Sequence, residues 1–202
     1  MPAHQTVFVI DDDEAARESL TFLLRTEGMT SRAFSSARAF LDQLHKDQHG
    51  CIITDVRMPE MDGITLVNTL AEIGCTMPII VITGHADVPL AVQAMKAGVA
   101  DFIEKPFESE ALVGAVRLCL ETAHVRSVDE DRRASITRRR DTLTEREAQV
   151  LALVVDGLSN KEIANNLGIS FRTVEIYRAH VMSKMQADSL SDLVRMTISI
   201  AA

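Results

Sequence analysis

The sequence predicts an α/β domain built on a doubly wound, five-stranded parallel sheet, followed by a second, all-α domain. The chain has 202 residues, of which 47% are hydrophobic and 25% charged, as is ordinary for a folded globular protein. In residues 1–124, short β-branched apolar segments alternate with amphipathic ones, whereas the rest shows only helical periodicity. The balance of charge also differs between the two parts. Residues 1–124 hold 9 Lys and Arg against 18 Asp and Glu, whereas residues 125–202 hold 12 against 11. We therefore expect two domains with different partners.

Five segments of the first domain are predicted to be strands. Three are apolar without alternation, which is typical of strands buried on both faces of a parallel sheet: 7–10, 51–54 and 79–83. Two weaker strands, 31–34 and 101–104, are expected nearer an edge. The intervening segments repeat apolar residues at helical spacing, and glycines suited to helix ends follow them: Gly28, Gly50, Gly74 and Gly98. Five such units with right-handed crossovers place helices on both faces of the sheet.

Residues 125–141 form a charged stretch between the first part, 1–124, and the tail, 142–202. A flexible linker and a continuation of the preceding helix both remain open, because Asp129 and Arg133 lie at helical spacing. The tail contains two capping boxes, which begin helices: Thr144–Glu147 and Ser159–Glu162. A turn at 168–170 precedes a third helix over about 171–185, and a fourth is expected to begin near Asp188.

Carboxylates follow two of the predicted strands. Asp11 and Asp12 follow the first strand and Asp55 follows the third. These side chains converge if the two strands are neighbours, because ligands of a doubly wound sheet bind at the carboxyl ends of its strands. Such oxygens suit Mg²⁺. Lys105 and Thr83, at two further strand ends, would complete a site for phosphoryl transfer to Asp55. Taken singly, each of these residues also has a plain explanation as an N-cap, a turn residue or a surface lysine.

These residues stand within motifs that resemble the receiver domain of two-component response regulators, over residues 4–122. The motifs are Val9-Ile10-Asp11-Asp12-Asp13, Asp55-Val56-Arg57-Met58-Pro59, Gly63, Ile82-Thr83-Gly84-His85, Gly98-Val99-Ala100-Asp101-Phe102 and Glu104-Lys105-Pro106-Phe107. The resemblance implies that a sensor histidine kinase phosphorylates Asp55, and that self-catalysed transfer to and hydrolysis from this residue is the only enzymatic step.

The same resemblance assigns roles to the other residues of the site. The ligands it implies for Mg²⁺ or Mn²⁺ are Asp11, Asp12, Asp55 and the backbone carbonyl of Arg57. Thr83 and Lys105 would contact the phosphoryl group, and Thr83 and Phe102 would move together as a switch. The Lys105–Pro106 bond would be cis, as in the family.

Two short helices joined at 168–170 have helix-turn-helix dimensions, and the helix from about Phe171 would enter the major groove of DNA. Exposed residues are expected at its start: Arg172, Thr173, Glu175 and Ile176. Basic residues placed to meet phosphates are Lys161, Arg178 and Lys184. A helical bundle for protein contacts is the alternative. The motifs 143–147, 157–164 and 170–175 resemble the LuxR/NarL-type DNA-binding domain over about 138–200, which favours DNA.

The combined architecture resembles the FixJ-type regulators of nitrogen fixation. It implies a cytoplasmic activator that receives phosphate from a FixL-like kinase, binds double-stranded promoter DNA and works with RNA polymerase. Phosphorylation is expected to form a homodimer, to free the DNA-binding helix from an inhibitory contact, or both. The predicted dimer face consists of Val88, Val92, Met95, Lys96 and Asp101.

Other classes fit the sequence less well. The longest dense apolar run, 77–82, is far shorter than the ~20 residues of a membrane helix, and we expect no membrane partner and no secretory signal. Cys51, Cys75 and Cys119 are scattered, which predicts free thiols rather than disulfides or a zinc site. A Mg²⁺-dependent phosphohydrolase and a phosphorylated protein-interaction module remain as alternatives. The lack of a D-x-D-x-T/V motif around Asp55 counts against the first.

Overall fold

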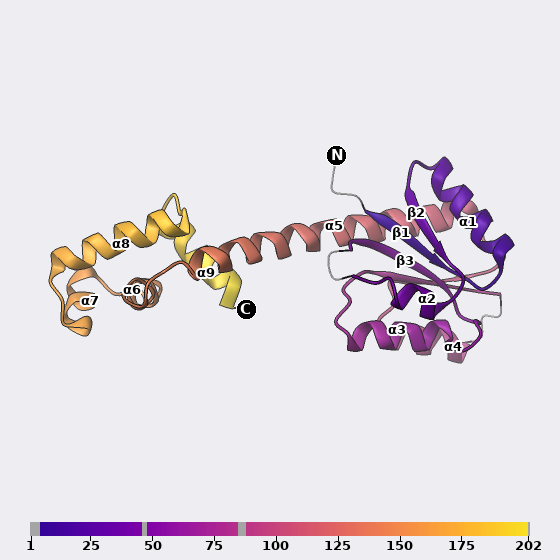
Figure 1. Cartoon of the computed structure of the whole chain (residues 1–202), viewed down its shortest axis with the longest axis horizontal. Helices are drawn as coiled ribbons and strands as arrows, with labels where there is room; N and C mark the ends of the chain where they lie inside the picture. The colour runs from indigo at the N-terminus through magenta and orange to yellow at the C-terminus, as the bar shows by residue number, and fades with distance from the viewer. Residues whose placement is uncertain (1–4, 46–47, 85–87, 202) are drawn as a thin grey trace. The chain divides into compact units, whose positions relative to one another are not determined.

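The alternating segments of the first part form a five-stranded sheet in which every neighbouring pair is parallel. The computed structural model describes residues 5–45, 48–84 and 88–201, so His85 of the 82–85 motif lies outside the described residues. The strands are β1 (Thr6–Ile10), β2 (Thr30–Phe34), β3 (Gly50–Asp55), β4 (Ile79–Thr83) and β5 (Asp101–Glu104). Their order is β2-β1-β3-β4-β5, which confirms the predicted sheet, and the chain order reverses between β1 and β3 (Figure 1).

Helices cover both faces of this sheet, as predicted. α1 (Glu14–Thr26) and the first part of α5 (Ser109–Arg140) pack on the face that carries Val7 and Val9. α2 (Ala37–Leu41), α3 (Gly63–Glu72) and α4 (Val88–Lys96) cover the face that carries Phe8 and Ile10 (Figure 1). Successive strand residues point to opposite faces, so a strand buried on both faces has to be apolar throughout.

Gly50 has a different role from the predicted one. It begins β3 instead of ending a helix, since α2 already ends at Leu41. A Cβ atom on Gly50 would lie 1.9 Å from the carbonyl oxygen of Thr6, so β3 can approach β1 this closely only with glycine at that position.

The charged stretch that follows the sheet is helical. α5 spans 32 residues and includes all of residues 125–140, for which the sequence left a linker and a helix open. The chain packs into two compact units, Met1–Ser127 and Val128–Ala202, and α5 contributes residues to both. None of the described helices is both long and apolar enough to cross a membrane.

The second unit contains α6 (Glu145–Val155), α7 (Asn160–Leu167), α8 (Phe171–Met185) and α9 (Leu190–Ala201). Both predicted capping boxes are present and begin α6 and α7. Gly168, in the left-handed conformation with a φ of 66°, ends α7, and the side chain of Ser170 caps α8. The unit's own core includes Ile136, Val150, Ile163, Val174 and Met185. This arrangement confirms the predicted all-α second domain.

Candidate functional site

Polar side chains from three strand ends meet at the carboxyl edge of the sheet. Ile10 pairs with Thr54 in register, so Asp11, just after β1, lies beside Asp55, the last residue of β3. Asp11 is 3% exposed and Asp55 9% exposed. Burial of two neighbouring carboxylates is costly unless a cation accompanies them. The predicted neighbours β1 and β3 therefore do bring Asp11 and Asp55 together.

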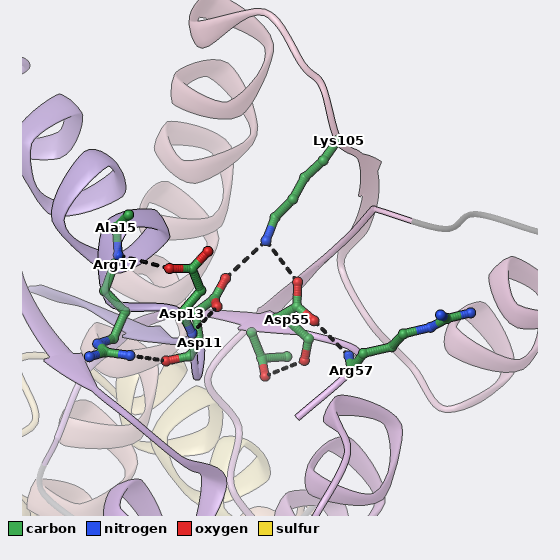
Figure 2. A network of polar contacts seen from close by, with 8 residues as sticks. Asp11, Asp13, Ala15, Arg17, Asp55, Arg57 and Lys105 are labelled. Atoms are coloured by element: carbon green, nitrogen blue, oxygen red, sulfur yellow. Dashed lines mark hydrogen bonds and ion pairs between the residues drawn. The ribbon is translucent and has the colours of Figure 1, made fainter. Parts of the chain in front are cut away.

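Lys105 supplies that cation from the end of β5, which is separated from β3 by β4. Its ammonium lies 2.9 Å from Oδ2 of Asp11 and 2.8 Å from Oδ1 of Asp55, and both contacts are ion pairs (Figure 2). The backbone N–H of Lys105 donates to the carbonyl of Thr83 at 2.7 Å, which fixes the start of this side chain against the end of β4. The Lys105–Pro106 peptide bond is cis, as the resemblance implied.

Backbone amides hold the other two carboxylate oxygens. The amide of Asp13 donates to Oδ1 of Asp11 at 2.9 Å, and the amide of Arg57 donates to Oδ2 of Asp55 at 2.6 Å (Figure 2). Each carboxylate is thus oriented by one amide and by its share of one ammonium. The rotation of both side chains is restricted before any ligand arrives.

The charges within this cluster do not balance. Two carboxylates share one ammonium, so the cluster retains a net negative charge. Burial lowers the pKa of Lys105, but hydrogen bonds and charge from Asp55 and Asp11 outweigh burial and raise that pKa above its ordinary value. Lys105 is therefore a permanent cation at neutral pH.

The buried carboxylates of this cluster fit a hard divalent cation. Carboxylate oxygens that accept one hydrogen bond keep a further lone pair, and Mg²⁺ prefers such ligands together with water. Asp12, however, is exposed, and no three Asp, Glu, His or Cys side chains among the described residues gather closely enough to hold a metal ion. Of the predicted ligands, Asp11 and Asp55 are buried at the strand ends, and Asp12 follows Asp11 in an exposed position that solvent can reach.

Three nearby residues position the cluster. Asp13 caps α1 by accepting the amide of Ala15 at 2.9 Å, as expected of it. The guanidinium of Arg17 donates to the carbonyl of Asp11 at 2.7 Å (Figure 2). Gly63, at the start of α3, lies so close to Asp55 that a Cβ atom would be 2.2 Å from the Asp55 carbonyl oxygen. Sequence reasoning missed Arg17, although its place four residues after a capping aspartate was a usable signal.

The two predicted switch residues differ in their surroundings. Thr83 is fully buried at the end of β4. Phe102, on β5, is half-buried and packs against the core cluster to which Ala94 of α4 belongs. The surface of α4 itself exposes apolar side chains, with Val88 78%, Met95 56% and Val92 46% exposed. Lys96 and Asp101 are exposed as well. All five residues predicted for the dimer face are thus accessible in the single chain.

In the second unit, α7 and α8 form the predicted helix-turn-helix. Lys161 and Arg172 are exposed, Ile176 is 45% exposed, and the guanidinium of Arg172 pairs with Glu175 at 3.1 Å. The Thr173 amide donates to the capping oxygen of Ser170 at 3.0 Å. These residues present a mixed polar and apolar surface at the start of α8.

Two of the predicted phosphate contacts have partners inside the unit. Arg178 donates to Oδ1 of Asn160 at 2.7 Å and so links α8 to α7. The Lys184 ammonium lies 2.6 Å from Oε2 of Glu147, a carboxylate that is 3% exposed, and donates to the Thr142 carbonyl at 3.2 Å. Glu147 therefore orients Lys184 within the unit, and the Lys184 side chain remains 35% exposed. The sequence did not reveal this pair because its members lie 37 residues apart.

Comparisons with known proteins agree with both units. The profile of the family described as "Response regulator receiver domain" matches residues 7–117, and that of "Bacterial regulatory proteins, luxR family" matches residues 141–197. "Transcriptional regulatory protein FixJ" of Azorhizobium caulinodans is 52% identical over 198 residues, which cover 98% of this chain and 94% of that protein. "Response regulator protein TodT" of Pseudomonas putida is 43% identical over 191 residues, 95% of this chain and 84% of that protein.

A solved structure extends the comparison to three dimensions. The response regulator StyR matches with a TM-score of 0.89 and 42% sequence identity, covering 97% of this chain and 99% of that one. Fold, site and comparisons thus define the class, a receiver domain joined to a DNA-binding domain. The chain belongs to the response-regulator family, within the FixJ-like group whose DNA-binding domain is of the luxR type. A sensor kinase and DNA are accordingly its expected partners.

Proposed function

We propose that the chain is a cytoplasmic transcription activator that is switched on by phosphorylation of Asp55. The observation that carries this proposal is the single ammonium of Lys105, bonded to both Asp55 and Asp11 at the carboxyl edge of the sheet. A phosphoryl group on Asp55 places new negative charge beside a cation that already lies there. Charge stabilisation by a preorganised donor is a large term in phosphoryl transfer.

The chemistry follows from these residues. A carboxylate oxygen of Asp55 attacks the phosphorus of the kinase's phosphohistidine, the P–N bond breaks, and the imidazole leaves with the electron pair and takes up a proton. Lys105 transfers hydrogen bonds from the two carboxylates to the phosphoryl oxygens, and the hydroxyl of Thr83 adds another donor. Mg²⁺ or Mn²⁺, when bound there, would supply further positive charge to offset that of the phosphoryl oxygens. The oxygens proposed to hold the cation belong to Asp11, Asp12, Asp55 and the carbonyl of Arg57. Hydrolysis of the acyl phosphate by water then ends the signal.

Phosphorylation is proposed to act on the α4–β5 surface. Phe102 packs beside α4, so a movement of Thr83 toward the phosphoryl group changes the space that Phe102 occupies and alters the face of α4. The exposed Val88, Val92 and Met95, together with Lys96 and Asp101, would then pair two chains. Two helix-turn-helix units bind two half-sites more tightly than one unit binds one half-site, through effective concentration.

DNA contact is proposed for the exposed start of α8 and for neighbouring basic residues. Arg172, Thr173, Glu175 and Ile176 would reach base edges, and Lys161, Arg178 and Lys184 would meet phosphates. Similarity to FixJ supports nitrogen-fixation promoters as targets, a FixL-like kinase as donor and activation through RNA polymerase. We divide the chain functionally into a receiver at 1–124, a connecting segment at 125–141 and a DNA-binding domain at 142–202.

One experiment tests the phosphoacceptor role. The full chain is incubated with Mg²⁺ and a small phosphodonor, then followed by intact mass and by size exclusion with light scattering. We expect a gain of one phosphoryl group and a doubling of the molar mass. Asp55→Asn preserves the shape of the side chain but removes the nucleophile, so it should gain neither. Phosphorylation that survives in Asp55→Asn would refute the assignment. Steady-state release of phosphate from external phosphomonoesters would instead favour a phosphohydrolase.

A second experiment tests the DNA surface. Binding of the phosphorylated chain to duplex DNA should fall steeply with salt, because phosphate contacts release counterions. Arg172→Ala should weaken binding by about 1–3 kcal/mol if the guanidinium reads a base. Arg195→Ala on α9, which removes another exposed arginine with a carboxylate partner, is the matched control. Equal effects of the two substitutions, or no binding at all, would favour a protein-binding role.

A further inference from the structure

The receiver unit contains a pair of cysteines that the phosphorylation chemistry does not use. Cys51 lies on β3 and Cys119 on α5, and both belong to the core cluster beneath α1 and α5. Each of these thiols lies near enough to shift the pKa of the other, and the Cys51 thiol donates to the Ile52 carbonyl at 3.7 Å. Cys51 is 0% exposed and Cys119 5% exposed. Two thiols packed into one strand–helix core are the arrangement that an intramolecular disulfide requires.

A cavity brings solvent to one member of this pair. It has a volume of about 370 Å³ and lies where β4 and β5 begin, at the end of the sheet opposite Asp55. Cys119 lines it together with Cys75, Leu118 and Arg126. One water molecule takes up roughly 30 Å³ in the liquid, so the cavity admits solutes several times larger than water. Cys51 does not line it.

The two thiols differ in pKa, and the one with the lower pKa is Cys119, which lines the cavity. The interaction with Cys51 lowers the pKa of Cys119, against opposing effects of burial and of the charge of Asp101. The pKa of Cys51 is raised, first by the same interaction and then by burial. Burial likewise raises the pKa of Cys75. Because the thiolate is the reactive form, Cys119 is the most nucleophilic of the three.

We propose that Cys119 is an oxidation site for a small hydroperoxide that enters the cavity, and that Cys51 is its resolving thiol. In the first step the Cys119 sulfur attacks the peroxide, the O–O bond breaks, and Cys119 becomes a sulfenic acid while water or an alcohol leaves. In the second step the Cys51 sulfur attacks the sulfenic sulfur and displaces water. Two thiols lose two electrons and two protons in total, the peroxide takes up both, and one intramolecular disulfide forms.

The disulfide would close a loop that contains most of the phosphorylation machinery. Residues 51–119 include Asp55, Thr83 and Lys105, whereas Asp11 lies outside. Oxidation would therefore tie β3, which carries Asp55 at its other end, to the helix that packs behind it. This site is separate from the phosphoacceptor cluster and does not depend on its assignment.

The test uses the reduced, folded full chain and hydrogen peroxide as the probe. After brief exposure the remaining thiols are alkylated and each cysteine is assigned by peptide mass mapping. We expect a loss of two hydrogen atoms in mass, a Cys51–Cys119 disulfide peptide, and Cys75 still alkylated. Oxidation of Cys119 should precede that of Cys75 by on the order of tenfold in rate. In Cys51→Ser, dimedone should trap a sulfenic acid on Cys119, and Cys75→Ser, the matched control, should oxidise as the wild type does.

Several outcomes would overturn the proposal. One is oxidation of Cys75 before Cys119, and another is disulfides that form only between chains. A third is a Cys119 that stays alkylatable at peroxide concentrations that oxidise Cys75. The wild-type mapping decides the matter even if a serine variant fails to fold, since the order of oxidation is read from the native chain.

Discussion

The two units of this molecule each bury a carboxylate beside a lysine, but the charges are balanced in only one of them. In the second unit, Glu147 has Lys184 at 2.6 Å, the Thr144 amide at 2.8 Å and His180 at 3.4 Å. In the first unit, the one ammonium of Lys105 serves two carboxylates. The Glu147 cluster is satisfied by its own fold, whereas the Asp55 cluster keeps negative charge that a bound cation would neutralise. A buried ion pair thus marks a binding site only where its charges remain unequal.

The largest contrast is expected from removing each lysine. Lys105→Ala removes the proposed donor to the phosphoryl group, and loss of one such donor lowers rates by about 10²–10³-fold. Phosphorylation of Asp55 by a small phosphodonor, followed by intact mass, should fall by that order. Lys184→Ala, the matched control, should be phosphorylated at the wild-type rate. Equal rates in the two variants would mean that Lys105 has no part in the transfer.

For the stability of the fold, the order should be reversed, with a larger loss from Lys184→Ala than from Lys105→Ala. Lys184→Ala leaves the buried Glu147 without its cation, and an unsatisfied buried group costs about 1–3 kcal/mol, with the lower end expected because the Lys184 side chain is 35% exposed. Tyr177 is the one tyrosine of a chain without tryptophan, and it packs against the core of the second unit. Tyrosine fluorescence during urea unfolding of the full chain therefore reports on that unit. An unchanged midpoint would contradict the structural role of Lys184.

A divalent cation should stabilise only the first unit, in which two buried carboxylates share one ammonium. A ligand that binds the folded state at ten times its dissociation constant adds about 1.4 kcal/mol of stability, so Mg²⁺ should raise the melting temperature of the receiver unit. Asp11→Asn removes one proposed ligand and should reduce this increment. Glu147→Gln should leave it intact. A Mg²⁺ effect that is the same in all three chains would indicate binding elsewhere.

The smallest expected effect is on the dependence of stability on pH in acid solution. The hydrogen bond from Lys184, together with the Thr144 amide, lowers the pKa of Glu147 from 4.5 to about 2. A carboxyl group with a lower pKa in the folded state stabilises the protein above its unfolded pKa. That contribution should be lost as pH falls from about 4.5 to about 2. Tyr177 fluorescence should show the loss in the wild type and a flatter profile in Glu147→Gln, with a slope difference of at most about one proton.

The contrast between the two clusters also separates what the sequence could predict from what it could not. Asp11, Asp55 and Lys105 were predictable because each follows a strand directly, and parallel strands end at the same edge. Asp12 was predicted from the same strand end, but its burial was not, because the fold leaves Asp12 exposed while it buries the adjacent Asp11. That difference depends on packing in the folded chain.

Lys184 is a residue whose partner could not be predicted from the sequence. Its charge and its place near the end of α8 predicted a phosphate contact, whereas its partner within the fold, Glu147, lies 37 residues earlier and was not predicted. The capping box that contains Glu147 was visible in the sequence and is confirmed. Local motifs such as caps, turns and strand ends could thus be predicted, whereas the partner of a long flexible side chain depends on packing that no local pattern records.

The close approach of Gly63 to Asp55 has a genetic consequence. Any Cβ at position 63 would meet the Asp55 carbonyl oxygen at 2.2 Å and the Cα of Val56 at 3.1 Å, so even alanine has to displace the backbone that carries the phosphoacceptor. Such an allele would leave every charged residue of the cluster in the gene and still fail to respond. A selection for signal-blind mutants should therefore recover Gly63 substitutions alongside those of Asp55 and Lys105, and second-site suppressors should map to the start of α3.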